Sequence, residues 1–206
     1  MKRIIGIYMA AGKSSRMGVD KLQLPIGRSR VGSRALLAAV RSNLEHIVVV
    51  TPTSGDPPWV DSELRREPFD KKWSLIPSSN SDQGQAYSLR SGLKAAYRRE
   101  PDAVMILLAD QPFVTSSQMN ALIASYERTP ESSYIASSYK GIPMPPVILD
   151  RMLFPEMEKL QGDEGARKIL SRMSLQGKLH CFDDPLWYYD VDTQQDYERL
   201  LQLHIP

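Results

Sequence analysis

The chain has 206 residues, of which 42% are hydrophobic and 24% charged, and its formal net charge is only +2 at pH 7. This length suits one domain with a sizeable core, and the near-neutral balance excludes the strongly basic surface of a nucleic-acid-binding or membrane-surface protein. No apolar run reaches about 18 residues and the N-terminal one is too short for a secretory segment, so we expect a cytoplasmic protein that binds small anions.

The first predicted element is a buried strand at Ile4–Met9, and the loop that follows it is built from small residues and spaced cations. Small residues let backbone N–H groups approach phosphate oxygens closely, while Arg16 and Lys21 supply neutralising charge. The spacing matches neither the Walker P-loop nor the G-x-G-x-x-G dinucleotide fingerprint. We therefore predict a phosphate-binding loop of another kind, which reads Ala10-Ala11-Gly12-Lys13-Ser14-Ser15-Arg16-Met17-Gly18.

Helices and strands then alternate through the first half of the chain. Periodicity and turn residues predict a helix over Ser33–Leu44, strands over His46–Thr51 and Ser74–Ile76, and a helix capped from within Ser79–Asp82. Ala103–Ala109 is seven apolar residues long, which suits a central parallel strand buried on both faces.

The second half is less regular. A capping box of Thr115 with Gln118 starts a helix, and the elements expected after it are strands over Ser133–Tyr139, Lys178–Phe182 and Tyr188–Val191, short helices over Arg151–Leu160 and Glu164–Met173, and a last helix capped by Thr193. Lys140–Pro146 is too rich in proline for regular structure. The lone Cys181 is expected to be a buried core thiol, and the isolated histidines His46, His180 and His204 lack metal-site spacing.

Two acidic positions are candidate metal ligands. Asp110 closes the most apolar strand, where a carboxylate opposite a phosphate loop suits Mg²⁺ and its bound phosphates, although a turn aspartate is an equal alternative. Asp190 and Asp192 share one face of the short strand expected there, so either one could be a second ligand; alternatively Asp192 only helps to start the last helix. Because ligands of parallel sheets bind beyond the carboxyl ends of strands, the phosphate loop and Asp110 should face one cleft.

Taken together, these segments resemble the nucleotidyltransferases that act on molybdenum cofactor. The loop with Lys21 is similar to the family signature A-A-G-x-S-x-R-M-G-x-x-K, and four later motifs match in order: Gly84–Leu93, Leu108–Pro112, Gly162–Arg167 and Asp190–Thr193. Guanylyl-transferring members typically carry A-G-G at Ala10–Gly12, so the alanine and the G-D-x-G-A-R-like segment resemble the cytidylyl branch.

The resemblance implies a Rossmann-like three-layer α/β nucleotide-diphospho-sugar transferase fold with a mostly parallel mixed sheet, in which residues 1–112 bind nucleotide and residues 113–206 bind the acceptor. It implies Mg²⁺-dependent transfer of CMP from CTP to the terminal phosphate of molybdopterin, with transient contact to a molybdenum hydroxylase. The roles implied are nucleotide binding by Ala10, Ala11, Gly12, Lys13, Ser14, Ser15, Arg16, Lys21 and Ser88, catalysis by Arg16, Lys21 and Asp110, metal binding by Asp110 with Asp192 or Asp190, and acceptor binding by Asp163 and Arg167.

The chain departs from the family pattern in two places, which leaves alternatives open. A G-x-P-L-L-like stretch is replaced by Gly27–Leu37, whose Arg28, Arg30 and Arg34 could contact the acceptor phosphate, and a G-H-P motif is replaced by Gly141–Pro146. GMP transfer, transfer to another small phosphate, and a non-catalytic carrier of the cofactor are the other hypotheses.

Overall fold

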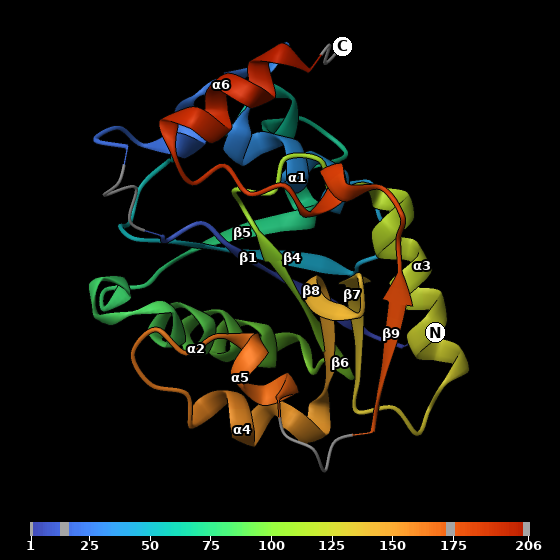
Figure 1. Cartoon of the computed structure of the whole chain (residues 1–206). Helices are drawn as coiled ribbons and strands as arrows, with labels where there is room; N and C mark the ends of the chain where they lie inside the picture. Colours follow the sequence, from blue (N-terminus) through green and yellow to red (C-terminus); the bar gives the residue numbers. More distant parts are fainter. Residues whose placement is uncertain (1, 13–16, 172–175, 204–206) are drawn as a thin grey trace.

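A seven-stranded sheet forms the centre of the computed structural model, which describes residues 2–12, 17–171 and 176–203 (Figure 1). The strand order is β5-β4-β1-β6-β8-β7-β9, and only β8 runs antiparallel to its neighbours. The strands are β1 (Ile4–Met9), β4 (His46–Thr51), β5 (Trp73–Pro77), β6 (Ala103–Leu108), β7 (Tyr134–Tyr139), β8 (Ile142–Asp150) and β9 (Gly177–Cys181), with a small separate hairpin of β2 (Pro25–Ile26) and β3 (Ser29–Arg30).

Helices cover both faces of the sheet and complete three layers (Figure 1). One face carries α1 (Val31–Val40), α3 (Ser116–Arg128) and α6 (Gln194–Gln202), and the other carries α2 (Gln85–Ala96), α4 (Phe154–Glu158) and α5 (Ala166–Leu170). The α/β class, the mostly parallel mixed sheet and the three layers expected from the sequence are therefore confirmed.

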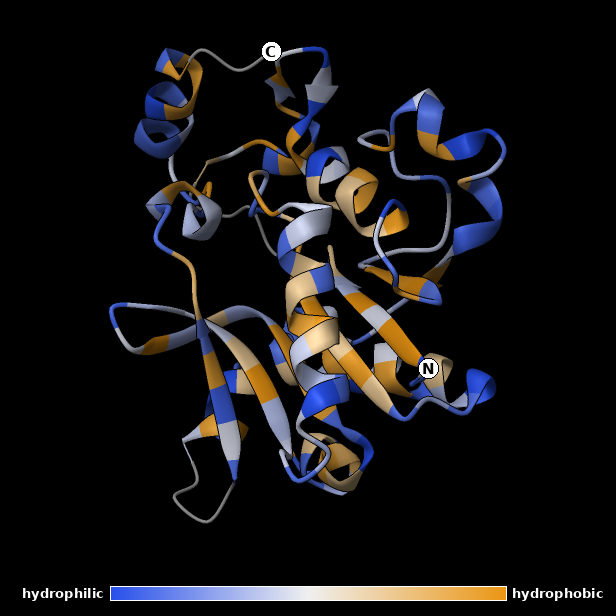
Figure 2. Ribbon diagram, turned by 90° about the vertical axis from the view of Figure 1, so that its right-hand side faces the viewer, coloured by the Kyte–Doolittle hydropathy of each residue, from blue (hydrophilic) through white to orange (hydrophobic). Residues whose placement is uncertain are grey.

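Strand β1 shows why the sequence folds in this way. Its side chains alternate between the two faces, so Ile4 and Tyr8 pack under α1 while Ile5 and Ile7 pack under α2. All six residues are buried, and each fully buried large aliphatic side chain contributes roughly 1.5–3 kcal/mol. Figure 2 shows the hydrophobic residues gathered along the central strands and on the helix surfaces that face them.

The proline-rich segment departs from its prediction, because Lys140–Pro146 is regular from Ile142 onward as the first half of β8. There β8 pairs only with β7, and its pairing with β6 begins at Val147, after the prolines. Proline lacks an N–H donor and is tolerated where a strand has one neighbour. The register also shifts between Ala136 and Ser137 of β7, which accommodates the irregularity.

Three smaller expectations are also wrong. Residues 188–191 form no strand: a 3₁₀ turn at Pro185–Tyr188 is followed by extended chain. Cys181 is exposed at the end of edge strand β9. Helix α2 is capped by Gly84 rather than by a side chain from Ser79–Asp82. None of the described helices is long and apolar enough to cross a membrane.

Candidate active site

The carboxyl ends of β1, β4 and β6 meet at one edge of the sheet, where the predicted site residues lie. Ala10 follows β1 and its N–H donates to the Val50 carbonyl of β4 (2.9 Å), while the N–H of Ala109, after β6, donates to the Met9 carbonyl (3.2 Å). The phosphate loop and Asp110 therefore start side by side. Lys13, Ser14, Ser15 and Arg16 lie outside the described residues.

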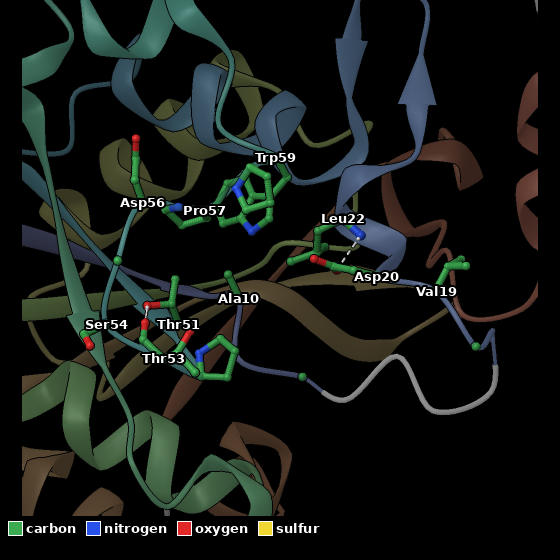
Figure 3. Close-up of a pocket in the computed structure, with 15 residues that line it drawn as sticks. Ala10, Val19, Asp20, Leu22, Thr51, Thr53, Ser54, Asp56, Pro57 and Trp59 are labelled. Atoms are coloured by element: carbon green, nitrogen blue, oxygen red, sulfur yellow. Dashed lines mark hydrogen bonds between the residues drawn. The ribbon is translucent and has the colours of Figure 1, made fainter.

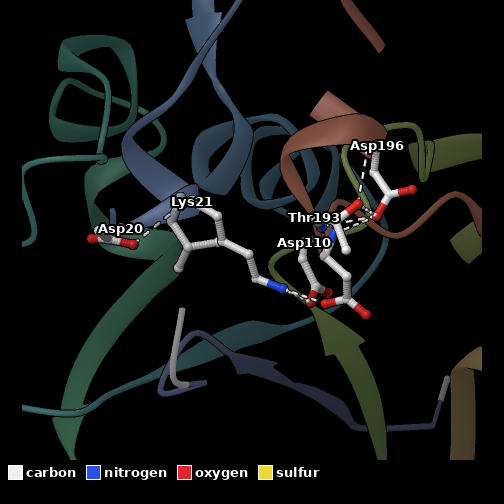
Figure 4. A network of polar contacts seen from close by, with 7 residues as sticks. Asp20, Lys21, Asp110, Thr193 and Asp196 are labelled. Carbon is white, nitrogen blue, oxygen red and sulfur yellow. Dashed lines mark hydrogen bonds and ion pairs between the residues drawn. The ribbon is translucent and has the colours of Figure 1, made fainter. Parts of the chain in front are cut away.

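Lys21 and two carboxylates form the charged centre of this edge (Figure 4). The Lys21 Nζ lies 2.6 Å from Asp110 Oδ2 and 2.8 Å from Asp192 Oδ1. The side chain of Lys21 is only 11% exposed, against 23% for Asp110 and 37% for Asp192, so the lysine is covered and the carboxylates open toward solvent. Residues 89 and 171 positions apart from Lys21 thus converge on a single atom.

Local structure places each member of this centre. Asp20 caps the 3₁₀ turn Lys21–Gln23 by accepting from the Leu22 N–H, which orients the lysine (Figure 4). On the other side, the Val191 N–H donates to the Asp110 carbonyl at 3.0 Å. The expected cap of the last helix is confirmed as a reciprocal capping box between Thr193 and Asp196.

The charges of the site are interdependent. Burial alone would lower the pKa of Lys21, but the ionic contacts with Asp110 and then Asp192 outweigh it and raise that pKa, so the ammonium stays charged. Burial, followed by the nearby Asp110 carboxylate, raises the pKa of Asp190 to about 6. Asp190 does not contact Lys21 as Asp192 does; it lies beside the buried amide of Gln111, without a well-directed hydrogen bond between them.

A cavity of about 400 Å³ lies between the phosphate loop and the N-terminus of α2. Five predicted site residues line it: Ala11, Gly12, Ser88, Asp110 and Asp163. Gly84, the N-cap of α2, lines this cavity with φ +125°, and a Cβ there would lie 2.2 Å from the Gly162 backbone, so α2 begins in close contact with the segment before Asp163. The cavity therefore joins the predicted nucleotide residues to the predicted acceptor segment.

A second cavity, of about 560 Å³, shares Gly12 with the first (Figure 3 shows its lining). Ala10 and Asp20 line it together with the loop that leaves β4, from Thr51 to Trp59. Sequence reasoning assigned that loop no role. Its place after a parallel strand was the signal that could have identified it, since the loops at this edge of the sheet form ligand sites.

The predicted acceptor residues line a third cavity, of about 310 Å³. Asp163 and Arg167 lie there with Asp190, and Gln85 and Leu108 belong to both this cavity and the one beside Ser88. Pro143, Met144 and Pro145 of the proline-rich part of β8 also line this third cavity, in the segment that replaces the G-H-P motif of the family pattern. Arg28 and Arg34 lie elsewhere, in a groove of about 780 Å³ beside α1, and Arg30 pairs with Asp61.

The carboxylates of Asp110 and Asp192 fit as two ligands of a six-coordinate divalent cation whose other positions are filled by water and substrate. Asp110 and Asp192 each aim a carboxylate oxygen at one point, which Lys21 Nζ fills. The described residues contain no cluster of three or more His, Cys, Asp or Glu side chains that could hold a metal alone. Mg²⁺ usually takes one or two carboxylates and fills its other positions with water and substrate phosphates, so the pair matches that ion.

Residues 6–178 match the model of the MobA-like NTP transferase domain. The chain belongs to the MobA-like NTP transferase family. Its resemblance to nucleotidyltransferases is thus confirmed.

Individual relatives agree with this assignment. The chain is 38% identical over 199 residues to the Bacillus subtilis purine catabolism protein PucB, covering 96% of this chain and 95% of that protein. Rv0371c of Mycobacterium tuberculosis shares the fold with a TM-score of 0.79 at 24% identity, over 98% of each chain, and it has also been solved in complex with manganese. Molybdopterin-guanine dinucleotide biosynthesis protein A of Archaeoglobus fulgidus has a TM-score of 0.67 at 16% identity, over 97% of each chain.

Proposed function

We propose that this MobA-like nucleotidyltransferase moves CMP from CTP to the terminal phosphate of molybdopterin and releases pyrophosphate. The observation that carries the proposal is the convergence of Lys21 and Asp192 on Asp110, which lines the same cavity as Ala11, Gly12 and Ser88. A triphosphate in that cavity would lie near both the Lys21 ammonium and the two carboxylates.

The residues suit a reaction without a general base. The attacking phosphate monoester is largely dianionic at neutral pH, because its second pKa is about 6, so it needs positioning rather than deprotonation. Lys21, with Arg16 from the loop, would neutralise the triphosphate as the bond between the α-phosphorus and pyrophosphate breaks. Backbone N–H groups beside Gly12 would hold the phosphates in line with the acceptor.

Two features support cytosine and molybdopterin over other substrates. Ala11 puts a methyl group on the wall of the cavity where guanylyl-transferring relatives carry glycine, which favours the smaller base. The adjoining cavity of Asp163 and Arg167 would take the acceptor, so that residues 1–112 bind nucleotide and residues 113–206 bind molybdopterin. The relation to a purine catabolism protein supports a molybdenum hydroxylase as the recipient of the product.

Asp110 and Asp192 would hold the divalent ion, for which Mg²⁺ is the proposed species. When bound, it supplies positive charge to the phosphates that leave. Asp190 is the weaker candidate ligand, because it lies beside Gln111 and, unlike Asp192, makes no hydrogen bond with Lys21 among the described residues. A relative of the same fold solved with manganese supports a divalent ion in this fold.

Thermal stabilisation by nucleotides tests the base assignment. With Mg²⁺ present, CTP at a hundred times its dissociation constant should stabilise the folded protein by about 2.7 kcal/mol, and GTP should stabilise it much less. Stabilisation by GTP and not by CTP would overturn the base, and would leave a guanylyltransferase.

A second reading, the non-catalytic carrier, makes a different prediction. A carrier binds molybdopterin tightly, releases no pyrophosphate and tolerates Asp110→Asn, whereas the transferase releases pyrophosphate and loses turnover in that variant. Mass spectrometry of the pterin product separates the two, since only transfer adds a CMP group.

A further inference from the structure

Lys21 Nζ lies where the proposed metal would lie. Its two short contacts, 2.6 Å to Asp110 Oδ2 and 2.8 Å to Asp192 Oδ1, use the same oxygens that a cation would take. Mg²⁺ requires about 2.1 Å to each ligand oxygen, which would bring it into contact with the ammonium. Two positive charges cannot share that point in a partly buried site, so one must leave before the other enters.

We propose that Lys21 is an internal competitor of the divalent cation: it holds the Asp110–Asp192 pair until a nucleoside triphosphate draws its ammonium away and frees the carboxylates for metal. The inference rests on the proposed function only in naming the triphosphate. It makes Lys21 a positioning residue in the free protein and a phosphate-binding residue in the complex.

The geometry gives the lysine a second anion to reach. Asp110, which Lys21 contacts, also lines the cavity of about 400 Å³ that would take the triphosphate, together with Gly12. A triphosphate carries more charge than one carboxylate, so it attracts the ammonium more strongly over a similar distance. Because coupling between two ligands is reciprocal, triphosphate then raises metal affinity and metal raises triphosphate affinity.

Removing a residue that ligates a metal weakens metal binding. If Lys21 competes with the metal, removing it should instead strengthen metal binding. In nucleotide-free protein, Mn²⁺ titrated under electron paramagnetic resonance should bind Lys21→Met at least about tenfold more tightly than wild type. Lys21→Arg keeps the positive charge and should bind Mn²⁺ as weakly as wild type. The Lys21→Met/Asp110→Asn double variant should lose the gained affinity, which assigns it to this carboxylate pair.

Controls keep the test independent of folding and of the reaction. Lys71→Met removes an exposed lysine that pairs with Glu67 and should leave Mn²⁺ binding unchanged. Thermal unfolding of Lys21→Met with and without Mn²⁺ reports whether the variant is folded, and its melting temperature should rise more with Mn²⁺ than that of wild type.

The outcomes separate this inference from the proposed function. Equal Mn²⁺ affinity of wild type and Lys21→Met in the absence of nucleotide overturns the competition, even if the wild-type protein releases pyrophosphate. A tenfold difference in Mn²⁺ affinity between the two proteins, with no pyrophosphate release by wild type, would support the competition and overturn the proposed transferase activity.

Discussion

Gly84 is the position where one added methyl group should do the most damage. It caps α2 with φ +125°, a conformation that side chains rarely adopt, and its added Cβ would lie 2.2 Å from the backbone C and O of Gly162 and 2.8 Å from the Asp163 N. The backbone strain costs about 1–3 kcal/mol, and overpacking adds about 1–3 kcal/mol. Because the obstructing atoms are backbone, no rotamer change relieves the clash, so Gly84→Ala should lower the free energy of unfolding by about 2–6 kcal/mol.

Urea unfolding of Gly84→Ala beside Gly55→Ala measures the effect. Gly55 also has φ +125° but has no atom within 4 Å of an added Cβ among the described residues, so it carries the strain without the clash. The difference between the two variants isolates the contact of α2 with residues 162–163. If Gly84→Ala and Gly55→Ala lose the same unfolding free energy, and Gly84→Ala still binds the acceptor as wild type does, the close contact of Gly84 with residues 162–163 would be refuted.

Three further predictions follow from single residues. Asp110→Asn should lower kcat in a pyrophosphate-release assay by about 10²–10³-fold with little change in melting temperature, because it removes charge at the reaction centre. Burial lowers the pKa of His46 to about 4, so as the pH falls the unfolded state binds this proton before the folded state does. Lowering the pH from 6.5 to 4 should therefore lower the free energy of unfolding by up to about 3 kcal/mol. His46→Gln should remove this contribution from urea unfolding curves. Gly92→Ala would place a Cβ 2.5 Å from Ile7 Cγ2, and should lower the unfolding free energy by about 1–2 kcal/mol despite a better helix propensity, whereas an unchanged value would contradict close packing of α2 on β1.

Sequence patterns predicted the parts of the fold that are set locally. The apolar runs at Ile4–Met9 and His46–Thr51 are strands with the expected ends, and the run expected at Ala103–Ala109 is a strand that ends one residue earlier, at Leu108. These runs are readable because a central parallel strand needs uninterrupted burial on both faces. The Thr193 cap is also present as expected, since a cap depends on residues three positions apart.

Features set by tertiary pairing were not readable in this way. The prolines of β8 are tolerated because β6 does not pair with that part of the strand. The alternation at Asp190 and Asp192 predicted a strand, but this segment is extended chain held by a hydrogen bond from the Val191 N–H to the Asp110 carbonyl. The pairing of Lys21 with both carboxylates likewise depends on residues up to 171 positions apart. The sequence indicated which residue types would meet but not which oxygen each would present.

Pyrophosphate release with each of the four nucleoside triphosphates, with and without molybdopterin, tests the central claim most directly. We predict release with CTP and Mg²⁺ only when molybdopterin is present, and its loss in Asp110→Asn. No release with any of the four nucleotides in the presence of molybdopterin, or release that persists in Asp110→Asn, would contradict the account of this site.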